Sequence, residues 1–331
     1  MASRARATPQ TFGRSPLSKS CRPSSPSSDI RLMRKIGLLT TMIGLLITTH
    51  VHPMYAVQVG SAADPFTWSG VMQPGAVLTI RNFNGRIDVR AGSGNRAEVR
   101  AERSSSRGAG DLTFAARNDG GDVSVCAVWR GHSACDRNDG WDNDDDGRDM
   151  RATITVTLPP GVALRGGTGN GAVSVDGTGG DISIATGNGD VRISGTAGTV
   201  KASSGNGDLD VTGAGGRVTA NTGNGHVRVT TGSGPVSAST GNGGITVNVR
   251  SLADAGDMKF TTGHGDIDVT LPASVNADFD ATTGWGSIHT DFPIRVDGSL
   301  NPRHIRGTIG RGGPRIHMST GFGAIDLRKT N

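Results

Sequence analysis

Apolar and polar residues alternate in short runs through the middle of the chain. Pairs of apolar residues two positions apart recur after each Gly-Asn-Gly tripeptide and again halfway to the next one: Val173/Val175, Ile182/Ile184, Val191/Ile193, Val200/Ala202, Leu209/Val211, Val218/Ala220, Val227/Val229, Val236/Ala238 and Ile245/Val247. Alternation with period two between glycine-rich turns predicts strands that bury one face. Each repeating unit is therefore predicted to be strand, turn, strand, turn.

The Gly-Asn-Gly tripeptides set the length of the unit. Their central residues lie 18 positions apart, at Asn170, Asn188, Asn206, Asn224 and Asn242, and looser copies occur at Asn84-Gly85, 263–265, 284–286 and 321–323. One such unit cannot bury its apolar face alone, whereas successive coils stacked ~4.8 Å apart pair every strand with its equivalent in the next coil. The sequence predicts an all-β, single-domain parallel β-helix or β-solenoid of about 18 residues per coil, preceded by a less regular β N-terminal part.

The turns of this solenoid have a predicted chemistry of their own. Glycine suits turns that need a positive φ, and it is unfavourable within the strands. Stacked asparagines are expected to form a ladder of side-chain amide hydrogen bonds along the axis. His264 and Trp285 interrupt that ladder near one end.

Two rows of residues between the inward pairs are predicted to face outward. One row contains Ser174, Arg192, Asp210, Arg228 and Thr246, and the other contains Ser183, Lys201, Thr219 and Ser237. Small polar and charged residues are typical of a solvated face, and the alternative is a broad, weak binding surface for a glycan or an envelope protein. Arg192, Asp210 and Arg228 are the candidate binding residues of that surface.

The chain resembles a bacterial putative-adhesin β-solenoid family, a glycine-rich repeat domain of unknown function. The resemblance covers residues 65–328, and it rests on GAVLTIRNFNGRIDV (75–89), VTLPPGV (156–162), the Thr-Gly-Asn-Gly turns, Leu271-Pro272 with Phe292-Pro293, and IGRGGPRIHMSTGFGAIDL (309–327). It implies a β-solenoid with a presumed surface role, and it brings no catalytic residues.

The N-terminal 56 residues are predicted to be a leader. Within it, residues 33–56 are typical of a secretory signal peptide, because Arg34 and Lys35 precede an apolar run and Ala56 ends a candidate cleavage site. An uncleaved anchor is the alternative, and either Met1 or Met33 can be the start. The expected protein is exported to the periplasm, the cell surface or the medium, with no membrane span in its mature chain. The remainder is divided into an N-terminal β region (57–160) with a polar acidic insertion (131–150), the repetitive solenoid (161–328) and a tail (329–331).

Net charge gives no indication of a nucleic-acid partner. The chain has 34 Lys and Arg, 29 Asp and Glu, and a formal charge of +5. Residues 1–56 contain eight of the basic residues and one acidic residue, which leaves 26 basic against 28 acidic residues and a charge of −2. The basic character belongs to the leader, so no nucleic-acid binding is expected.

Two local features are candidate sites in the N-terminal β region. Cys126 and Cys135 are expected to form a disulfide in an exported chain, with two free buried thiols as the alternative. Asp142, Asp144 and Asp146 with Gly147 match the first half of a calcium loop. The twelfth position of that loop is Thr153 in place of glutamate, so an unstructured acidic loop is the competing interpretation. Calcium is the one cofactor considered.

Catalysis is the weakest of three functional hypotheses. In a β-helix that cleaves polysaccharides, Asp190, Asp208 and Asp210 would be the carboxylates, and Arg192 and Arg228 would hold the substrate. Asp190 and Asp208 occupy equivalent turn positions, which turn chemistry explains without catalysis. The predicted protein is not an enzyme: it is an adhesin-like binding module or scaffold, with a self-associating structural solenoid as the alternative.

Overall fold

The computed structural model describes residues 58–59, 65–104, 112–129, 132–135, 151–251, 256–296 and 301–330. This part of the chain consists of strands and turns, and it contains no helix that is long and apolar enough to cross a bilayer. The predicted leader and the calcium candidates Asp142, Asp144 and Asp146 lie outside the described residues.

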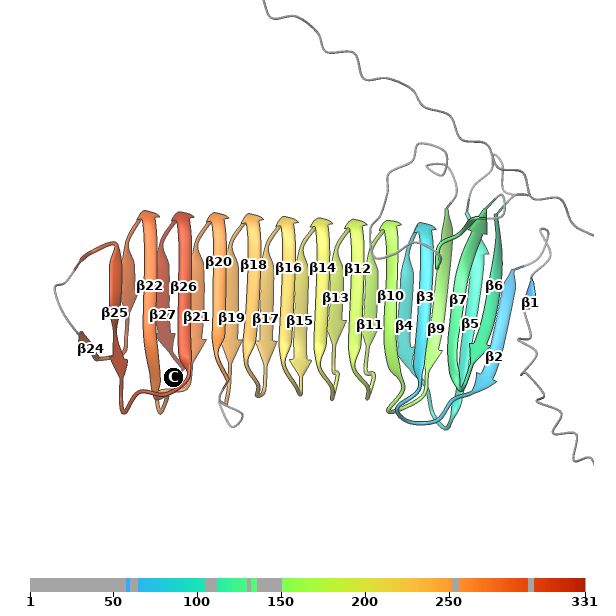
Figure 1. Cartoon of the computed structure of the whole chain (residues 1–331), viewed down its shortest axis with the longest axis horizontal. Helices are drawn as coiled ribbons and strands as arrows, with labels where there is room; N and C mark the ends of the chain where they lie inside the picture. Colours follow the sequence, from blue (N-terminus) through green and yellow to red (C-terminus); the bar gives the residue numbers. More distant parts are fainter. Residues whose placement is uncertain are drawn as a thin grey trace, which may run out of the picture. The chain divides into compact units, whose positions relative to one another are not determined.

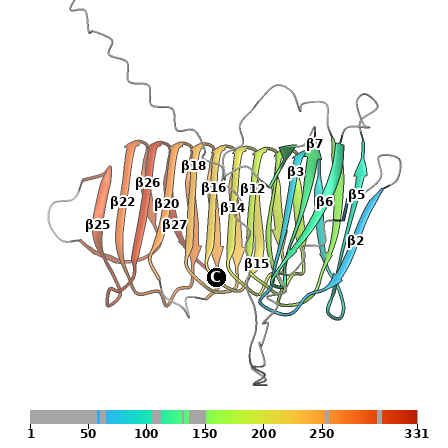
Figure 2. The same cartoon turned by 45° about the vertical axis from the view of Figure 1, so that its right-hand side comes forward.

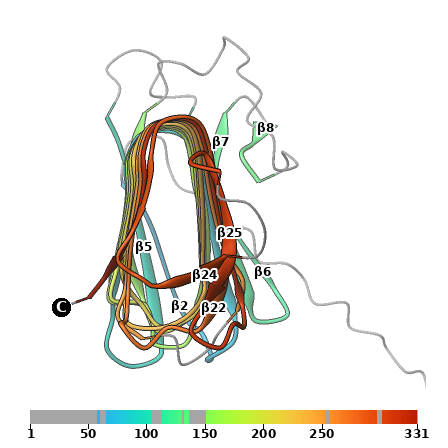
Figure 3. The same cartoon turned by 90° about the vertical axis from the view of Figure 1, so that its left-hand side faces the viewer.

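Strands in the described residues form two long sheets that face each other across the apolar core (Figure 3). Sheet A contains, in spatial order, β1 (Gln58–Val59), β6 (Leu112–Asp119), β7 (Asp122–Trp129), β3 (Val77–Asn84), β10 (Ala163–Asn170), β12 (Ile182–Asn188), β14 (Val200–Asn206), β16 (Val218–Asn224), β18 (Val236–Asn242), β20 (Met258–His264), β26 (Arg315–Phe322), β22 (Ala277–Trp285), β25 (His304–Ile309) and β24 (Ile294–Val296), with β8 (His132–Ser133) paired to β7. Sheet B contains β2 (Phe66–Val71), β5 (Arg96–Arg103), β9 (Ala152–Leu158), β4 (Ile87–Ala91), β11 (Val173–Asp176), β13 (Val191–Ser194), β15 (Leu209–Ala214), β17 (Val227–Thr231), β19 (Ile245–Val249), β21 (Ile267–Leu271), β27 (Ile325–Lys329) and β23 (Ile288–Thr290).

Each coil contributes one strand to each sheet, and the coils stack in parallel (Figure 1). The register keeps equivalent residues side by side: Leu209 of β15 lies between Val191 of β13 and Val227 of β17. All three side chains are at most 1% exposed, so they form one inward column. The predicted all-β solenoid is confirmed.

The Thr-Gly-Asn-Gly turn is explained residue by residue in the structure. The Thr222 hydroxyl is buried and donates to the carbonyl of Gly207 in the preceding coil (2.9 Å). The Asn224 amide donates to Oδ1 of Asn206 (2.7 Å), and the same bond joins every consecutive pair from Asn84 to Asn242. The second glycine of the turn has a positive φ, as at Gly225 (+145°). The predicted asparagine ladder is confirmed, and the role of the threonine is new.

Coil order departs from sequence order at both ends of the solenoid. The coil of β3 and β4 lies between the one formed by β7 and β9 and the one formed by β10 and β11. The coil of β26 and β27 lies between β20/β21 and β22/β23, as Figure 2 shows for β26. The expectation that every coil pairs with the next coil in sequence is therefore wrong at the ends. Matching inward residues make the insertion favourable, because Ile316 lies between Met258 and Phe279 in the buried column.

Antiparallel strands extend both sheets at one end of the stack and sheet A at the other, where sheet B ends in the parallel strand β23. At one end β5 pairs with β9 and β6 with β7, followed by β2 and β1. At the other end β25 pairs with β22, and β24 pairs with β25 and crosses the end of the stack (Figure 3). Self-association through the ends of the stack would need open strand edges, and among the described end strands only β23 is parallel to its neighbour. Antiparallel covering strands of this sort limit edge-to-edge pairing.

Cys126 and Cys135 form a disulfide beside the first of these ends. Cys126 lies in β7, Cys135 follows β8, and their Cα atoms are 5.7 Å apart. The bond ties the segment after β8 to the outer face of sheet A, because Cys126 lies in register with Arg81 and not with the inward Leu78 and Ile80. Cys126 is only 3% exposed on that face.

Candidate functional site

The outer surface of sheet B displays the first predicted row of outward residues. Parallel register places Ser174, Arg192, Asp210, Arg228 and Thr246 side by side on five consecutive strands, and we call these residues the outer row. Arg192 lies 4.0 Å from Asp210, measured from Nε to Oδ2. Arg228 pairs with Asp208 at 3.3 Å instead of with its row neighbour Asp210. The side chains of these charged pairs are between 42% and 72% exposed, so they remain accessible to a partner.

The outer row continues beyond the residues that the sequence analysis named. Asp268 follows Thr246 in register, and Asp326 follows Asp268. Arg328 bridges the two carboxylates, at 2.9 Å from Asp268 and 3.6 Å from Asp326. Burial raises the pKa of Asp268, and Arg328 opposes that shift. The 18-residue spacing did not predict the position of Asp326. Its strand β27 lies next to β21 because the last coil is inserted between two coils that come earlier in the sequence.

Two of the three candidate catalytic carboxylates, Asp190 and Asp208, hold turns together. Asp190 Oδ1 accepts a hydrogen bond from the backbone N–H of Asp208 (2.9 Å), and Asp208 Oδ1 accepts one from His226 (2.7 Å). His226 continues the series, because its Nδ1 accepts from the N–H of Gly244 (3.1 Å). Each side chain therefore binds the backbone of the following coil, in agreement with the interpretation as turn chemistry.

The turn geometry also sets the charge state of Asp208. The backbone N–H of His226 holds the pKa of the Asp208 carboxyl below its usual value, and the Arg228 guanidinium adds to this effect against the opposing effect of burial. A carboxyl whose pKa is lowered on folding stabilises the fold above its unfolded pKa, and that contribution is lost as the pH falls through the lowered value.

Asp208→Asn is expected to reduce the acid sensitivity of the solenoid. At neutral pH the variant should melt slightly below wild type, and the difference should shrink as the pH falls from about 4 through the lowered pKa of the folded Asp208 carboxyl. Melting curves followed by circular dichroism between acidic and neutral pH test this. A constant difference in Tm across that range would contradict the assignment.

The opposite row, formed by Ser183, Lys201, Thr219 and Ser237, occupies the outer surface of sheet A in continuous register. Lys201 is exposed, and its neighbours Ser183 and Thr219 carry only hydroxyl groups. This surface presents less charge than the outer row, which makes it a suitable control surface.

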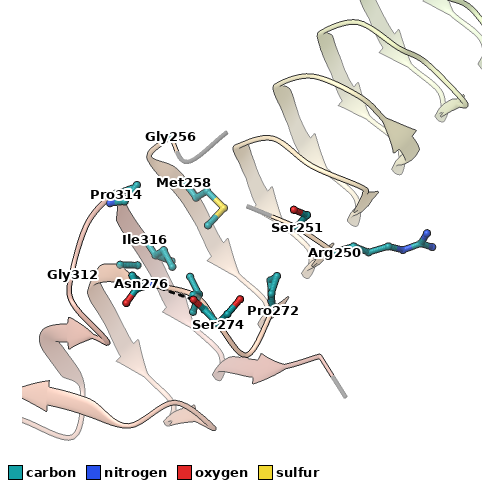
Figure 4. A pocket seen from close by; sticks show the side chains of 12 residues that line it. Arg250, Ser251, Gly256, Met258, Pro272, Ser274, Asn276, Gly312, Pro314 and Ile316 are labelled. Carbon is teal, nitrogen blue, oxygen red and sulfur yellow. Dashed lines mark hydrogen bonds between the residues drawn. The ribbon is translucent and has the colours of Figure 1, made fainter. Parts of the chain in front are cut away.

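One cavity of about 490 Å³ opens beside the last coils (Figure 4). Its apolar lining includes Met258, Val275 and Ile316, and Ser274 and Asn276 lie at the turn that borders it. The Arg250 side chain points away from the cavity in Figure 4. The cavity thus borders buried core residues, and its described lining residues bring together no set of catalytic groups.

A metal site was one of the hypotheses that the sequence raised. Among the described residues, no group of three or more His, Cys, Asp or Glu side chains is arranged to hold a metal ion. The carboxylates of the acidic insertion are not among those residues, and their calcium hypothesis stays a prediction.

Comparison with known proteins identifies the family of this solenoid. The model of the Toastrack DUF4097 family matches residues 78–328. The chain belongs to this family. Toastrack membership confirms the family resemblance that the sequence indicated.

No curated protein matches the chain. The solved structures that are similar to this Toastrack chain include two at 12% sequence identity. A "putative cell adhesion protein" from Clostridium sporogenes aligns with a TM-score of 0.28, covering 81% of this chain and 100% of its own. A "putative adhesin" from Bacteroides fragilis aligns with a TM-score of 0.37, covering 81% of this chain and 98% of its own.

Aromatic residues at the turns were missed as a group by the sequence analysis, which treated His264 and Trp285 only as interruptions of the ladder. In the structure the column of asparagines continues in the order Asn242, His264, Phe322 and Trp285. The signal in the sequence was the replacement of asparagine by a ring within an otherwise unchanged Gly-X-Gly turn.

Proposed function

We propose that this Toastrack protein is a non-enzymatic, exported envelope or surface protein that works as an adhesin-like binding module or scaffold. The outer row carries the proposal: it presents accessible charged and hydroxyl side chains at a fixed spacing on five consecutive strands. Inward positions are committed to packing, and the candidate carboxylates Asp190 and Asp208 are committed to turns. Export is inferred from the signal peptide predicted at residues 33–56.

Binding through the outer row would sum many weak contacts. Exposed ion pairs contribute little each, typically below ~1 kcal/mol, so no single residue is expected to dominate. The rigid spacing of the strands lowers the entropy cost of presenting several groups at once. A partner with a repeating surface, such as an envelope protein array or a glycan, fits this arrangement.

Simultaneous replacement of Arg192, Asp210 and Arg228 by alanine is expected to weaken binding to isolated cell envelopes by about tenfold, whereas each single replacement should change it little. Co-sedimentation of purified protein with envelope fractions measures this binding. The thermal midpoint should stay within a few degrees of wild type, because Arg192 and Arg228 are exposed and the Asp210 side chain is 42% exposed.

The matched control replaces Lys201, Thr219 and Ser237 of the opposite row, and it should bind as wild type. Full binding by the outer-row variant would contradict the proposal. If replacement of Asp142, Asp144 and Asp146 then abolished binding, the acidic insertion would be the site.

A further inference from the structure

The central residues of the Gly-X-Gly turns form a column along the solenoid, which we call the turn column. It consists of asparagines up to Asn242 and ends in the rings of His264, Phe322 and Trp285. Within the described residues, Trp285 and Phe322 are large hydrophobic side chains that are mostly exposed, at 64% and 51%, and Val71 is the other one. His264 stacks on Phe322 with ring centroids 4.9 Å apart and planes 3° from parallel. The guanidinium of Arg303 lies 5.0 Å from the centre of the Trp285 ring. The rings sit where β20, β26 and β22 end at the upper edge in Figure 1.

Burial does not explain these rings, since aromatic side chains normally bury most of their large apolar area. Their neighbours hold them in place without covering them: His264 supports Phe322 on one side, and Arg303 lies against Trp285. Glycines flank each ring on both sides in the chain, at 263 and 265, 284 and 286, and 321 and 323. The residues next to each ring in the chain therefore carry no side chain that could cover it, and a ligand can approach the exposed parts of Trp285 and Phe322.

The rings continue directly into a line of amides. Moving away from the rings, His264 is followed in register by Asn242, then by Asn224 and then by Asn206. These amides are exposed, and each is fixed by the bond to its neighbour (2.7 Å), so little rotamer freedom remains to be lost on binding. The column thus offers apolar ring surface at one end and fixed donors and acceptors along the rest.

We propose that this column binds a neutral oligosaccharide chain, with a sugar ring against Trp285 and Phe322 and further units along the asparagines. A sugar ring has C–H groups on its faces and hydroxyls at its rim, so it matches aromatic surface and amides respectively. The Arg303 guanidinium supplies additional donors beside the ring. The site is separate from the outer row, and it stands or falls independently of the function proposed above.

The shape of the column favours a glycan over a protein partner. A stable protein interface buries about 1,200–2,000 Å² around a clustered apolar centre. Here the apolar groups form a strip one residue wide, bordered by glycines and amides. One recognition group per coil, repeated at ~4.8 Å, corresponds to a linear chain of ring-shaped units.

Isothermal titration calorimetry of the full-length protein with cellohexaose, chitohexaose, laminarihexaose and mannohexaose tests the proposal. At least one of these neutral probes should bind, with little dependence on salt, since the column relies on no ion pair to its ligand. Trp285→Ala should weaken that binding by about tenfold or more, and Trp285→Phe by clearly less, because a ring is kept. Asn242→Ala should weaken binding of the hexasaccharide more than binding of the matching disaccharide.

Val71→Ala removes a comparable exposed hydrophobic side chain elsewhere, and it should bind as wild type. The outer-row triple variant should also retain glycan binding. Thermal midpoints of all variants separate loss of binding from loss of fold. The proposal is overturned if no neutral probe binds, if Trp285→Ala binds as wild type, or if Trp285 is needed for envelope binding that protease treatment of the envelopes abolishes.

Discussion

Leu209→Asp is expected to destabilise the solenoid by more than about 5 kcal/mol. The substitution removes a fully buried leucine side chain, and such a truncation alone costs about 2–5 kcal/mol. It also places a carboxylate in the apolar core, where an unpaired charge is strongly unfavourable. Val191 and Val227, the column neighbours on either side, offer only methyl groups. Thermal and urea unfolding followed by circular dichroism measure the loss.

The matched control places the same charge on the outside of the same sheet, two strands away. Thr246 of β19 is exposed, and it lies between Arg228 and Asp268 in the outer row. Thr246→Asp is therefore expected to change stability by about 0.5 kcal/mol or less. Equal Tm values for Leu209→Asp and wild type would refute the inward assignment of the column.

Gly207→Ala is the second substitution with a large expected effect. Gly207 has a φ of +152°, which side-chain-bearing residues rarely adopt, and a Cβ at this position would collide with the backbone carbonyl of Gly189 in the preceding coil. Backbone strain and overpacking each cost about 1–3 kcal/mol, so a loss of about 2–6 kcal/mol is expected. The stacked backbone cannot relax without lengthening the bonds between coils.

Gly232→Ala separates this steric effect from a general cost of replacing glycine. Gly232 is exposed, and a Cβ there would meet no atom within 4 Å. The control should remain within about 0.5 kcal/mol of wild type in urea unfolding. A similar loss in both variants would mean that the contact between Gly207 and Gly189 is not what restricts the turn.

The interior of the array was predictable from the sequence because its physics is local and repeated. Period two fixes which residues of β15 face inward, and the spacing of 18 fixes which residues of neighbouring coils meet. The asparagine ladder follows from the same spacing. Thr222 was less visible, since a buried hydroxyl is recognised only when its acceptor, the carbonyl of Gly207, is known.

The ends were not predictable in the same way, because spacing gives no information about which coil is the neighbour there. Trp285 and Phe322 are 37 positions apart in sequence and directly adjacent in register. Any coil with apolar residues at the inward positions can pack against any other, so β26 is chemically acceptable on several neighbours. The ion pair between Arg228 and Asp208 was not predicted either, because the long arginine side chain can reach several acidic neighbours and the spacing does not say which one it contacts.

The inserted coils affect how the array can come apart. A repeat protein whose neighbours in space are also neighbours in sequence can fray one unit at a time from its ends. Here β26 and β27 have a coil on each side, and removing them separates two interfaces at once, as does removing β3 and β4 at the opposite end. Terminal fraying is thereby suppressed, and unfolding of the outermost coils should be coupled to that of the coils inside them.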